Sequence, residues 1–510
     1  MNNKSQLKTG ILLNYINQGA GNLIPLFYTP IMLSLLGQTE YGLYKLSSNV
    51  TSYLGLASFG IGSAVTRYII KAQIDGGKKA EEETLGTFLS LFKIVAVIAF
   101  SVGCILCFKL KDWYGGALSS SELKRMALLV FIMTCNTSIG FVMAPYYSVI
   151  TAHEKFTFLE CVSLLNTCIL PAINLLVLFL GCASVGLAIV SLSVGVVTRA
   201  CYTGFVNRQL HLRARKSGAS IDKLKEILSF SFWVFVSNIV GQLYYSTDTV
   251  MIGLVPALAT SGVAVYSIGA LISNAVFSLS NGVSQFLIPK TNKMVLSDSK
   301  PEELTELAIK VGRIQAYMNA LLMTGFAAFG RSFIYLYTKN SGGDYSEAYW
   351  VALLLMIPGS VPLLQSTCMN IIVAQNKHRF RSLMYLGIAI INVIGTWFLI
   401  HTHFGIIGAA LVTGVALIIG PGLVMNWYYE KIIGLNIKLF WKKTGVVFLI
   451  PICLCAVAVF IGRFVNYTSV PAFIAGVLVY TAAFAALSWK LIMNPYEKKL
   501  LRSMAKPFGR

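Results

Sequence analysis

The chain is poor in charge, and poorest in acidic residues. Of its 510 residues, 12% are charged and 56% are hydrophobic, whereas roughly 25% of a soluble domain is charged. A soluble protein of this length would need more charged residues to cover its surface. The composition therefore excludes an ordinary soluble enzyme, a fibrous protein and a disordered chain, and it favours a protein that lipid covers.

Catalytic and metal-binding motifs are also lacking. The sequence contains no phosphate-binding P-loop, no GxSxG nucleophile and no HExxH pair. Its ten cysteines lie mostly within or beside apolar runs, where a thiol acts as a small hydrophobic side chain. His401 and His403 form an isolated pair without a neighbouring carboxylate. We therefore expect no metal site, no cofactor and no enzymatic activity.

Long apolar segments, in contrast, are abundant. A helix needs about 20 apolar residues to cross a bilayer, and the sequence contains fourteen stretches of that kind. The predicted spans are residues 11–36, 42–66, 86–108, 126–150, 156–180, 184–206, 228–254, 262–288, 312–337, 347–374, 382–402, 405–428, 444–463 and 469–492.

The charge distribution predicts the orientation of these spans. The formal net charge is +21, and membrane proteins concentrate Lys and Arg in their cytoplasmic loops. With the N-terminus in the cytoplasm, about 32 of the 41 basic residues fall on that side. The loop that runs from Lys109 to Arg125 is the exception. We expect a multi-pass membrane protein with both termini cytoplasmic and no nucleic-acid partner.

The two halves of the chain resemble each other at an offset near 222. The matched positions are Asn14/Gln18 with Asn238/Gln242, Gly62 with Gly282, Ala152–Lys155 with Ala374–Lys377, and Val185–Ala188 with Ile407–Ala410. Six spans per half is an even number, so both halves enter the membrane from the same side. This predicts an all-α integral membrane protein with two parallel six-helix lobes and two further C-terminal helices. The predicted divisions are an N-lobe at 1–206, a connector at 207–227, a C-lobe at 228–430 and a C-terminal part at 431–510.

The first predicted span is unusually polar. Asn14, Gln18 and Asn22 are spaced by four residues and therefore share one face of a helix. The corresponding residues of the seventh span are Asn238, Gln242 and Tyr245. Such side chains either bond to neighbouring helices or line a polar cavity. We favour a cavity between the lobes that binds substrate, because both halves carry the polar stripe on their first helix.

Charged residues within the spans are few, so each is a candidate functional residue. Lys45 and Asp248 lie near the outer ends of their spans, and we expect them to approach when the outward face is closed. The alternative is that Lys45 extends to the lipid headgroups. Glu160 pairs with a nearby arginine or carries a coupling proton. Arg67 and Arg313 suit a phosphate group, but a cytoplasmic anchoring role explains either one alone.

Two groups of segments carry a family resemblance. They are Leu35–Tyr44, Phe59–Gly62 and Arg67-Tyr68 in the first half, and Asp344–Ala348, Ala374–Phe380, Ile391-Asn392 and Phe404–Ala410 in the second. In these motifs the chain resembles the polysaccharide-biosynthesis flippases of the multidrug/oligosaccharidyl-lipid/polysaccharide exporter superfamily. The likeness covers most of residues 8–430.

The resemblance implies a flippase of the bacterial inner (plasma) membrane that moves an undecaprenyl-diphosphate-linked oligosaccharide from the inner to the outer leaflet by alternating access. It implies a cationic central cavity, for which Arg67, Lys45 and Arg313 are the candidates, and only Arg67 matches a family position. The implied partners are the lipid-linked glycan, membrane lipids, and the polymerase and glycosyltransferases of the same pathway. We expect a monomer.

Two alternatives stay open, and a third, an enzyme, lacks support in the sequence. The fourteen-span layout also resembles the lipid II flippases, although this first span lacks the extra cationic residue expected there. A cation-coupled multidrug antiporter of the same superfamily favours intramembrane acids, and Asp248 and Glu160 are the strong candidates here. A membrane enzyme of the glycan pathway needs a large outer loop with catalytic residues, and the sequence contains no such loop.

Overall fold

The computed structural model describes residues 3–215, 221–285, 291, 293–295, 297, 299–375, 377 and 379–505. Residues 216–220 of the predicted connector, Asn376 of the predicted repeat and the side chain of Tyr245 lie outside the described part. Its regular structure consists of helices, without a strand among the described residues.

The chain forms two compact units. Unit 1 is residues 1–264 with 340–343, and unit 2 is residues 265–339 with 344–510. These units differ from the predicted lobes, because unit 1 also contains the helices of the predicted seventh span. The predicted lobe boundaries therefore stay a prediction.

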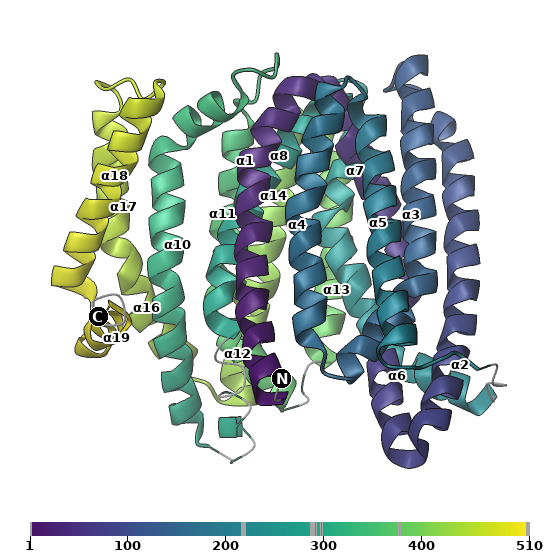
Figure 1. The fold of residues 1–510 in the computed structure, drawn as a ribbon. Helices are drawn as coiled ribbons and strands as arrows, with labels where there is room; N and C mark the ends of the chain where they lie inside the picture. The colour runs from purple at the N-terminus through teal and green to yellow at the C-terminus, as the bar shows by residue number, and fades with distance from the viewer. Residues whose placement is uncertain are drawn as a thin grey trace. The chain divides into compact units, whose positions relative to one another are not determined.

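The helical elements of unit 1 include long helices that run side by side and two short ones, η1 and α7 (Figure 1). They are α1 (Asn3–Ser52), η1 (Tyr53–Ser58), α2 (Ile61–Tyr114), α3 (Ser120–Ala152), α4 (Phe156–Phe179), α5 (Ala183–Arg208), α6 (Ile221–Tyr245), α7 (Thr247–Leu254) and the first residues of α8 (Ala259–Gln285). The start of α3 follows from its sequence, because Ser119 and Glu122 form a reciprocal capping box.

Two glycines allow α1 and α2 to turn within a single residue. The 50 residues of α1 would extend about 75 Å if straight, far beyond a hydrocarbon core of about 30 Å. Gly37 has a φ of 73° and Gly77 a φ of 60°, which are the only non-helical positions inside these helices. Helix α1 runs through Pro25 and Pro30 with helical angles. The loop expected at 37–41 is thus a one-residue turn.

The predicted second span, 42–66, is not continuous. The chain tightens into η1 and then passes through Phe59 and Gly60, both with positive φ, before α2 begins. A left-handed residue ends a helix, since it turns the chain away from the helical path.

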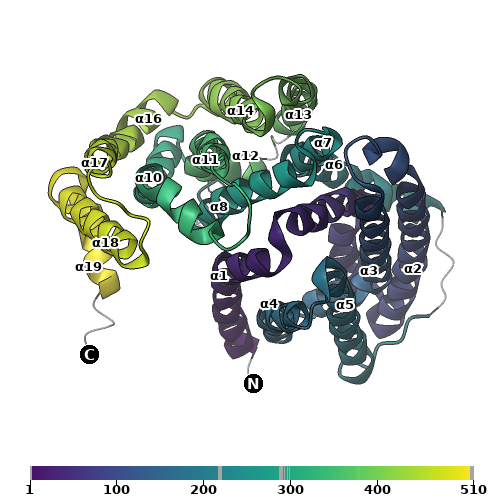
Figure 2. The same ribbon diagram turned by 90° about the horizontal axis from the view of Figure 1, so that it is seen from above.

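Three helix pairs dominate the packing of unit 1 (Figure 2): α1 packs against α4, and α3 packs against both α2 and α5. The core contains Phe88 and Phe92 of α2 and Val149 and Ile150 of α3, all nearly inaccessible. Close approach requires glycine at position 86, where a Cβ would lie 1.8 Å from the carbonyl oxygen of Arg215.

Unit 2 contains the rest of α8 and all later elements. They are α10 (Pro301–Thr338), α11 (Ala348–Leu364), α12 (Ser366–Ala374), α13 (Arg379–Ile400), α14 (Gly405–Leu417), η2 (Ile418–Val424), α15 (Met425–Tyr428), η3 (Tyr429–Ile433), α16 (Ile437–Gly445), η4 (Val446–Phe448), α17 (Leu449–Ile461), α18 (Val470–Leu487), η5 (Ser488–Ile492) and α19 (Pro495–Ala505).

Helix α10 contacts most of the other helices of unit 2. It packs against α11 and α12 and also against α16, α17 and α18. Its first turn begins with Pro301 and continues with Glu302 and Glu303, as is typical of a helix N-terminus. A buried cluster that includes Leu304, Ile371 and Phe440 joins α10 to α12 and α16.

The described residues form 11 helical segments long and apolar enough to cross a membrane, or 12 if α11 and α12, bent by 47°, are one broken span. Two differences from the predicted fourteen have a visible cause. One segment, Leu13–Ser58, contains the first predicted span and part of the second, and the seventh predicted span is divided between α6 and α7. The all-helical membrane fold is confirmed, and the number fourteen stays a prediction.

Candidate functional site

A cluster of polar side chains joins α1 to α4 within unit 1. The carboxylate of Glu160 accepts hydrogen bonds from Asn14 Nδ2 at 2.9 Å and from Asn17 Nδ2 at 3.3 Å. Asn17 also donates to Ser163 Oγ at 2.6 Å and accepts from Thr167 Oγ1 at 2.9 Å. Among the ion pairs of the described residues, none includes Glu160. Amide groups therefore stabilise this carboxylate where the sequence suggested an arginine.

The remainder of the polar stripe is linked along α1 itself. Gln18 Nε2 donates to Asn14 Oδ1 at 3.0 Å, and Asn22 Nδ2 donates to the carbonyl oxygen of Gln18 at 2.8 Å. Helix–helix hydrogen bonding thus accounts for Asn14, whereas the hydrogen bond that Asn22 donates stays within α1. Asn17, which the four-residue spacing left out, makes the larger number of contacts with α4.

Helices α6 and α7 contact the second part of α1 and η1. Gln242 Nε2 donates to Ser52 Oγ, and Tyr53 shares a hydrogen bond of 2.6 Å with Thr247. Asn238 is exposed on α6. The structure therefore brings Gln242 into contact with the end of α1.

Asp248 and Lys45 were predicted to approach each other. The side chain of Asp248 is buried, with 1% of the residue exposed, next to Thr247. Lys45 Nζ lies 5.5 Å from the ring centroid of Tyr41, one turn earlier on α1. Gly253, on the same helix as Asp248, packs so tightly that a Cβ would lie 2.7 Å from the side chain of Leu46. The approach of Lys45 to Asp248 stays a prediction.

The two candidate arginines differ strongly in their surroundings. Arg67 is exposed near the start of α2. Arg313 is 8% exposed, and each of its three nitrogens contacts an acceptor. Its Nε lies 2.5 Å from Glu497 Oε1, its Nη1 donates to the carbonyl oxygen of Lys443 at 2.6 Å, and its Nη2 donates to the carbonyl oxygen of Ile492 at 3.1 Å. This placement favours a structural role for Arg313, which holds the C-terminal helix.

The contact with Arg313 changes the pKa of the Glu497 carboxyl group. Burial alone would raise the pKa of its carboxyl group. Hydrogen bonds from Arg313 and from the backbone N–H of Asn494, together with the positive charge of Arg313, outweigh burial and lower the pKa below its usual value.

Arg199 was missed in the sequence although it lies within a predicted span. On α5 its Nη1 donates to Asn136 Oδ1 of α3 at 2.7 Å. Glycines make room for this pair, because a Cβ at Gly140 would lie 2.9 Å from Nη2 of Arg199 and one at Gly195 would lie 2.7 Å from Asn136 Oδ1. The available signal was an arginine inside an apolar run with a glycine one turn before it.

Metal ligands do not gather in the described part of the chain, where no group of three or more His, Cys, Asp and Glu could hold an ion. None of the ten cysteines forms a disulfide bond. The chemistry available is therefore that of polar contacts and of a few buried charges.

Solved structures with this fold are membrane transporters. The lipid II flippase MurJ, in an inward closed conformation, matches with a TM-score of 0.70 and 14% identity, over 95% of this chain and 99% of that one. An inward-facing multidrug resistance MATE family transporter of the MOP superfamily matches with a TM-score of 0.64 and 15% identity, over 84% and 99%. The chain therefore has the same overall fold as these two membrane proteins.

The sequence identifies the family within that class. Residues 7–295, more than half of the chain, match the family described as polysaccharide biosynthesis protein, and the chain belongs to it. A Salmonella typhi protein named "Putative O-antigen transporter" is 21% identical over 422 residues, which is 80% of this chain and 93% of that protein. The predicted family of polysaccharide-biosynthesis flippases is confirmed, and the Salmonella typhi relative is named as a transporter and not as an enzyme.

Proposed function

We propose that this protein is a flippase that translocates an undecaprenyl-diphosphate-linked oligosaccharide from the inner to the outer leaflet of a bacterial cell membrane. Family membership over residues 7–295 carries this proposal. A diphosphate with attached sugars cannot cross hydrocarbon unaided, because its polar groups would lose their hydration. Alternating access between the two predicted lobes, with both termini in the cytoplasm, provides a shielded route.

Glu160 is the proposed coupling residue. It is an intramembrane carboxylate held by neutral amides, so it keeps the capacity to bind a proton or a cation. Asn14 and Asn17 of α1 both donate hydrogen bonds to this carboxylate. Neutralising Glu160 weakens these bonds, which join α1 to α4, and frees α1 to move. Substrate contacts are proposed for Arg67, Lys45 and the polar residues of α1 and α6, including Tyr245.

The leaflet distribution of the glycan–lipid tests the translocation. Deleting the gene is expected to leave the lipid-linked glycan in the inner leaflet, where impermeant glycan-modifying reagents added to intact spheroplasts do not reach it. Accumulation in the outer leaflet would contradict a flippase and support an enzyme that acts after translocation.

Replacement of Glu160 tests the coupling. Glu160→Gln keeps the size of the side chain but removes its charge, and we expect translocation to fall about tenfold or more. Glu302→Gln, at an exposed acid of α10, is the matched control and should translocate normally. Wild-type transport by Glu160→Gln would contradict the coupling role and leave the flippase proposal intact.

A drug antiporter is the second candidate, favoured by the same unpaired acid and by the MATE-like fold. Ethidium efflux in cells that express the protein separates the two, since the flippase proposal expects none. Rescue of cells depleted of their own lipid II flippase would instead support a peptidoglycan precursor as substrate.

A further inference from the structure

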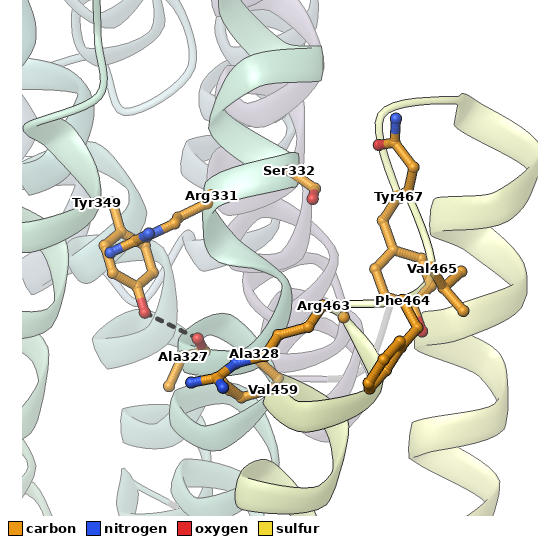
Figure 3. A pocket seen from close by; sticks show the side chains of 12 residues that line it. Ala327, Ala328, Arg331, Ser332, Tyr349, Val459, Arg463, Phe464, Val465 and Tyr467 are labelled. Atoms are coloured by element: carbon orange, nitrogen blue, oxygen red, sulfur yellow. Dashed lines mark hydrogen bonds between the residues drawn. The ribbon is translucent and has the colours of Figure 1, made fainter.

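A cavity of about 610 Å³ lies in unit 2, where α10 and the start of α11 meet the turn that joins α17 to α18 (Figure 3). This volume is within the range of small-molecule binding sites. The polar and aromatic side chains that line it are Arg331 and Ser332 of α10, Tyr349 of α11, and Arg463, Phe464, Asn466 and Tyr467 of the turn.

The charge of this cavity is entirely positive. Two arginines line it, and none of its lining residues is an aspartate or glutamate. Among the residues that the structure describes, no ion pair includes Arg331 or Arg463. Two guanidinium groups facing one cavity without a counter-ion favour an anion there, and the planar fork of arginine matches phosphate oxygens.

Aromatic rings hold one of these arginines in place. The Cζ atom of Arg331 lies 5.2 Å from the ring centroid of Tyr349 and 5.6 Å from that of Trp350. Tyr349 is itself fixed, because its hydroxyl donates to the carbonyl oxygen of Ala327 at 2.8 Å (Figure 3). Stacking orients the guanidinium without using its N–H donors, which stay available for a ligand.

The turn on the other side of the cavity is also packed. The ring of Tyr467 lies 5.1 Å from that of Phe329 on α10, measured between centroids. A Cβ at Gly476 of α18 would lie 2.8 Å from Tyr467, so the ring occupies the space a larger residue would need. Ring packing therefore holds the side chains on both sides of the cavity, and these contacts do not use the N–H groups of Arg331 and Arg463.

The position within unit 2 suits the membrane interface. Arg331 lies seven residues before the end of α10, about 10 Å along the helix, and Arg463 lies two residues after the end of α17. Phe464, beside Arg463, is 76% exposed. The sequence places this end on the outer side, where loops otherwise carry few basic residues.

We propose that this cavity is a binding site for a phosphate group, with Arg331 and Arg463 as its donors and the headgroup of an anionic phospholipid or a soluble phosphate as its source. This site is separate from the polar cluster of α1 and α4, and the proposal does not depend on the transported substrate.

Native mass spectrometry of the full-length protein tests the site with phosphatidylglycerol and phosphatidylcholine as probes. Wild-type protein is expected to retain phosphatidylglycerol preferentially, and the double variant Arg331→Gln/Arg463→Gln should bind it about tenfold more weakly. Arg502→Gln is the matched control. Arg502 lies on α19, away from the cavity lining, and its guanidinium also lies over an aromatic ring, that of Trp489 in η5. It should bind like wild type.

A second titration, with inorganic phosphate, distinguishes the source. Competition with the lipid at millimolar phosphate indicates a soluble ligand, and its absence indicates a lipid headgroup. Should the double variant fail to fold, Arg331→Lys/Arg463→Lys keeps both charges and should still weaken binding, since lysine lacks the fork. Undiminished lipid retention by a folded variant, or an equal loss in Arg502→Gln, overturns the proposal.

Discussion

Replacing Glu497 with glutamine is expected to release α19 from the rest of unit 2. The carboxylate contacts Arg313 through two bonds, Oε1 to Nε at 2.5 Å and Oε2 to Nη2 at 3.1 Å. Side-chain exposure is only 10% for Arg313 and 6% for Glu497. Glutamine has nearly the same shape, but it removes the negative charge and points an amide N–H₂ group toward the guanidinium.

The size of the effect follows from the burial of the pair. Removing one partner of a buried ion pair costs about 3–5 kcal/mol, because the remaining charge is uncompensated. Arg313 keeps its bonds to the carbonyl oxygens of Lys443 and Ile492, so the lower end of this range applies. About 3 kcal/mol corresponds to a roughly hundredfold larger population of undocked α19.

Hydrogen–deuterium exchange of residues 495–505 measures that population. Protection of the α19 amides should fall by about two orders of magnitude in Glu497→Gln, while that of α3 in unit 1 is unchanged. Lys499→Gln, at an exposed position of the same helix, is the control. Protection within threefold of wild type in Glu497→Gln would refute the reasoning, because it would mean that the pair does not hold the helix.

The stability that Glu497 contributes decreases as the pH falls. Because the folded pKa of Glu497 is lowered, its contribution is fully present above the pKa of a free glutamate, about 4.3, and is lost as the pH falls through the folded value. The difference in thermal midpoint between wild type and Glu497→Gln should be constant from neutral pH to about 5 and should shrink as the pH falls below the pKa of a free glutamate, about 4.3. A difference that persists in acid would contradict this account.

Three further substitutions test the packing. Gly77→Ala places a side chain at a φ of 60° and a ψ of −154°, which should cost about 1–3 kcal/mol and lower the thermal midpoint in detergent. Gly86→Ala meets the carbonyl oxygen of Arg215 and should expose the 207–215 segment to trypsin, whereas unchanged cleavage would contradict the contact. Tyr480→Phe removes a 2.7 Å hydrogen bond to Thr324 and should destabilise by about 1 kcal/mol, measured as a lowered thermal midpoint.

Apolar content and charge distribution were enough to predict the fold class. Runs such as 156–180 correspond closely to single helices, here α4, because lipid requires the backbone to bond within one segment. The one-residue turn at Gly37 and the η1 break were not predicted. Both depend on single backbone angles, for which hydropathy carries no signal.

The candidate site was predictable in part. Periodicity placed Asn14 on a polar face, yet it omitted Asn17, whose contacts with α4 depend on how the two helices are rotated. Arg313 pairs with Glu497, 184 positions away, and nothing in local spacing indicates so distant a partner. Arg199 was overlooked because a single arginine barely changes the mean hydropathy of its segment.

The pairing of Arg313 with Glu497 also sets an order for biosynthesis. Arg313 is synthesised 184 residues before Glu497, so its charge has no partner in α19 until that helix has been synthesised. Unit 2 is completed only when the final residues arrive, and a nascent chain that stops early retains a buried cation. Any fusion or truncation that displaces α19 therefore acts on the assembly of unit 2.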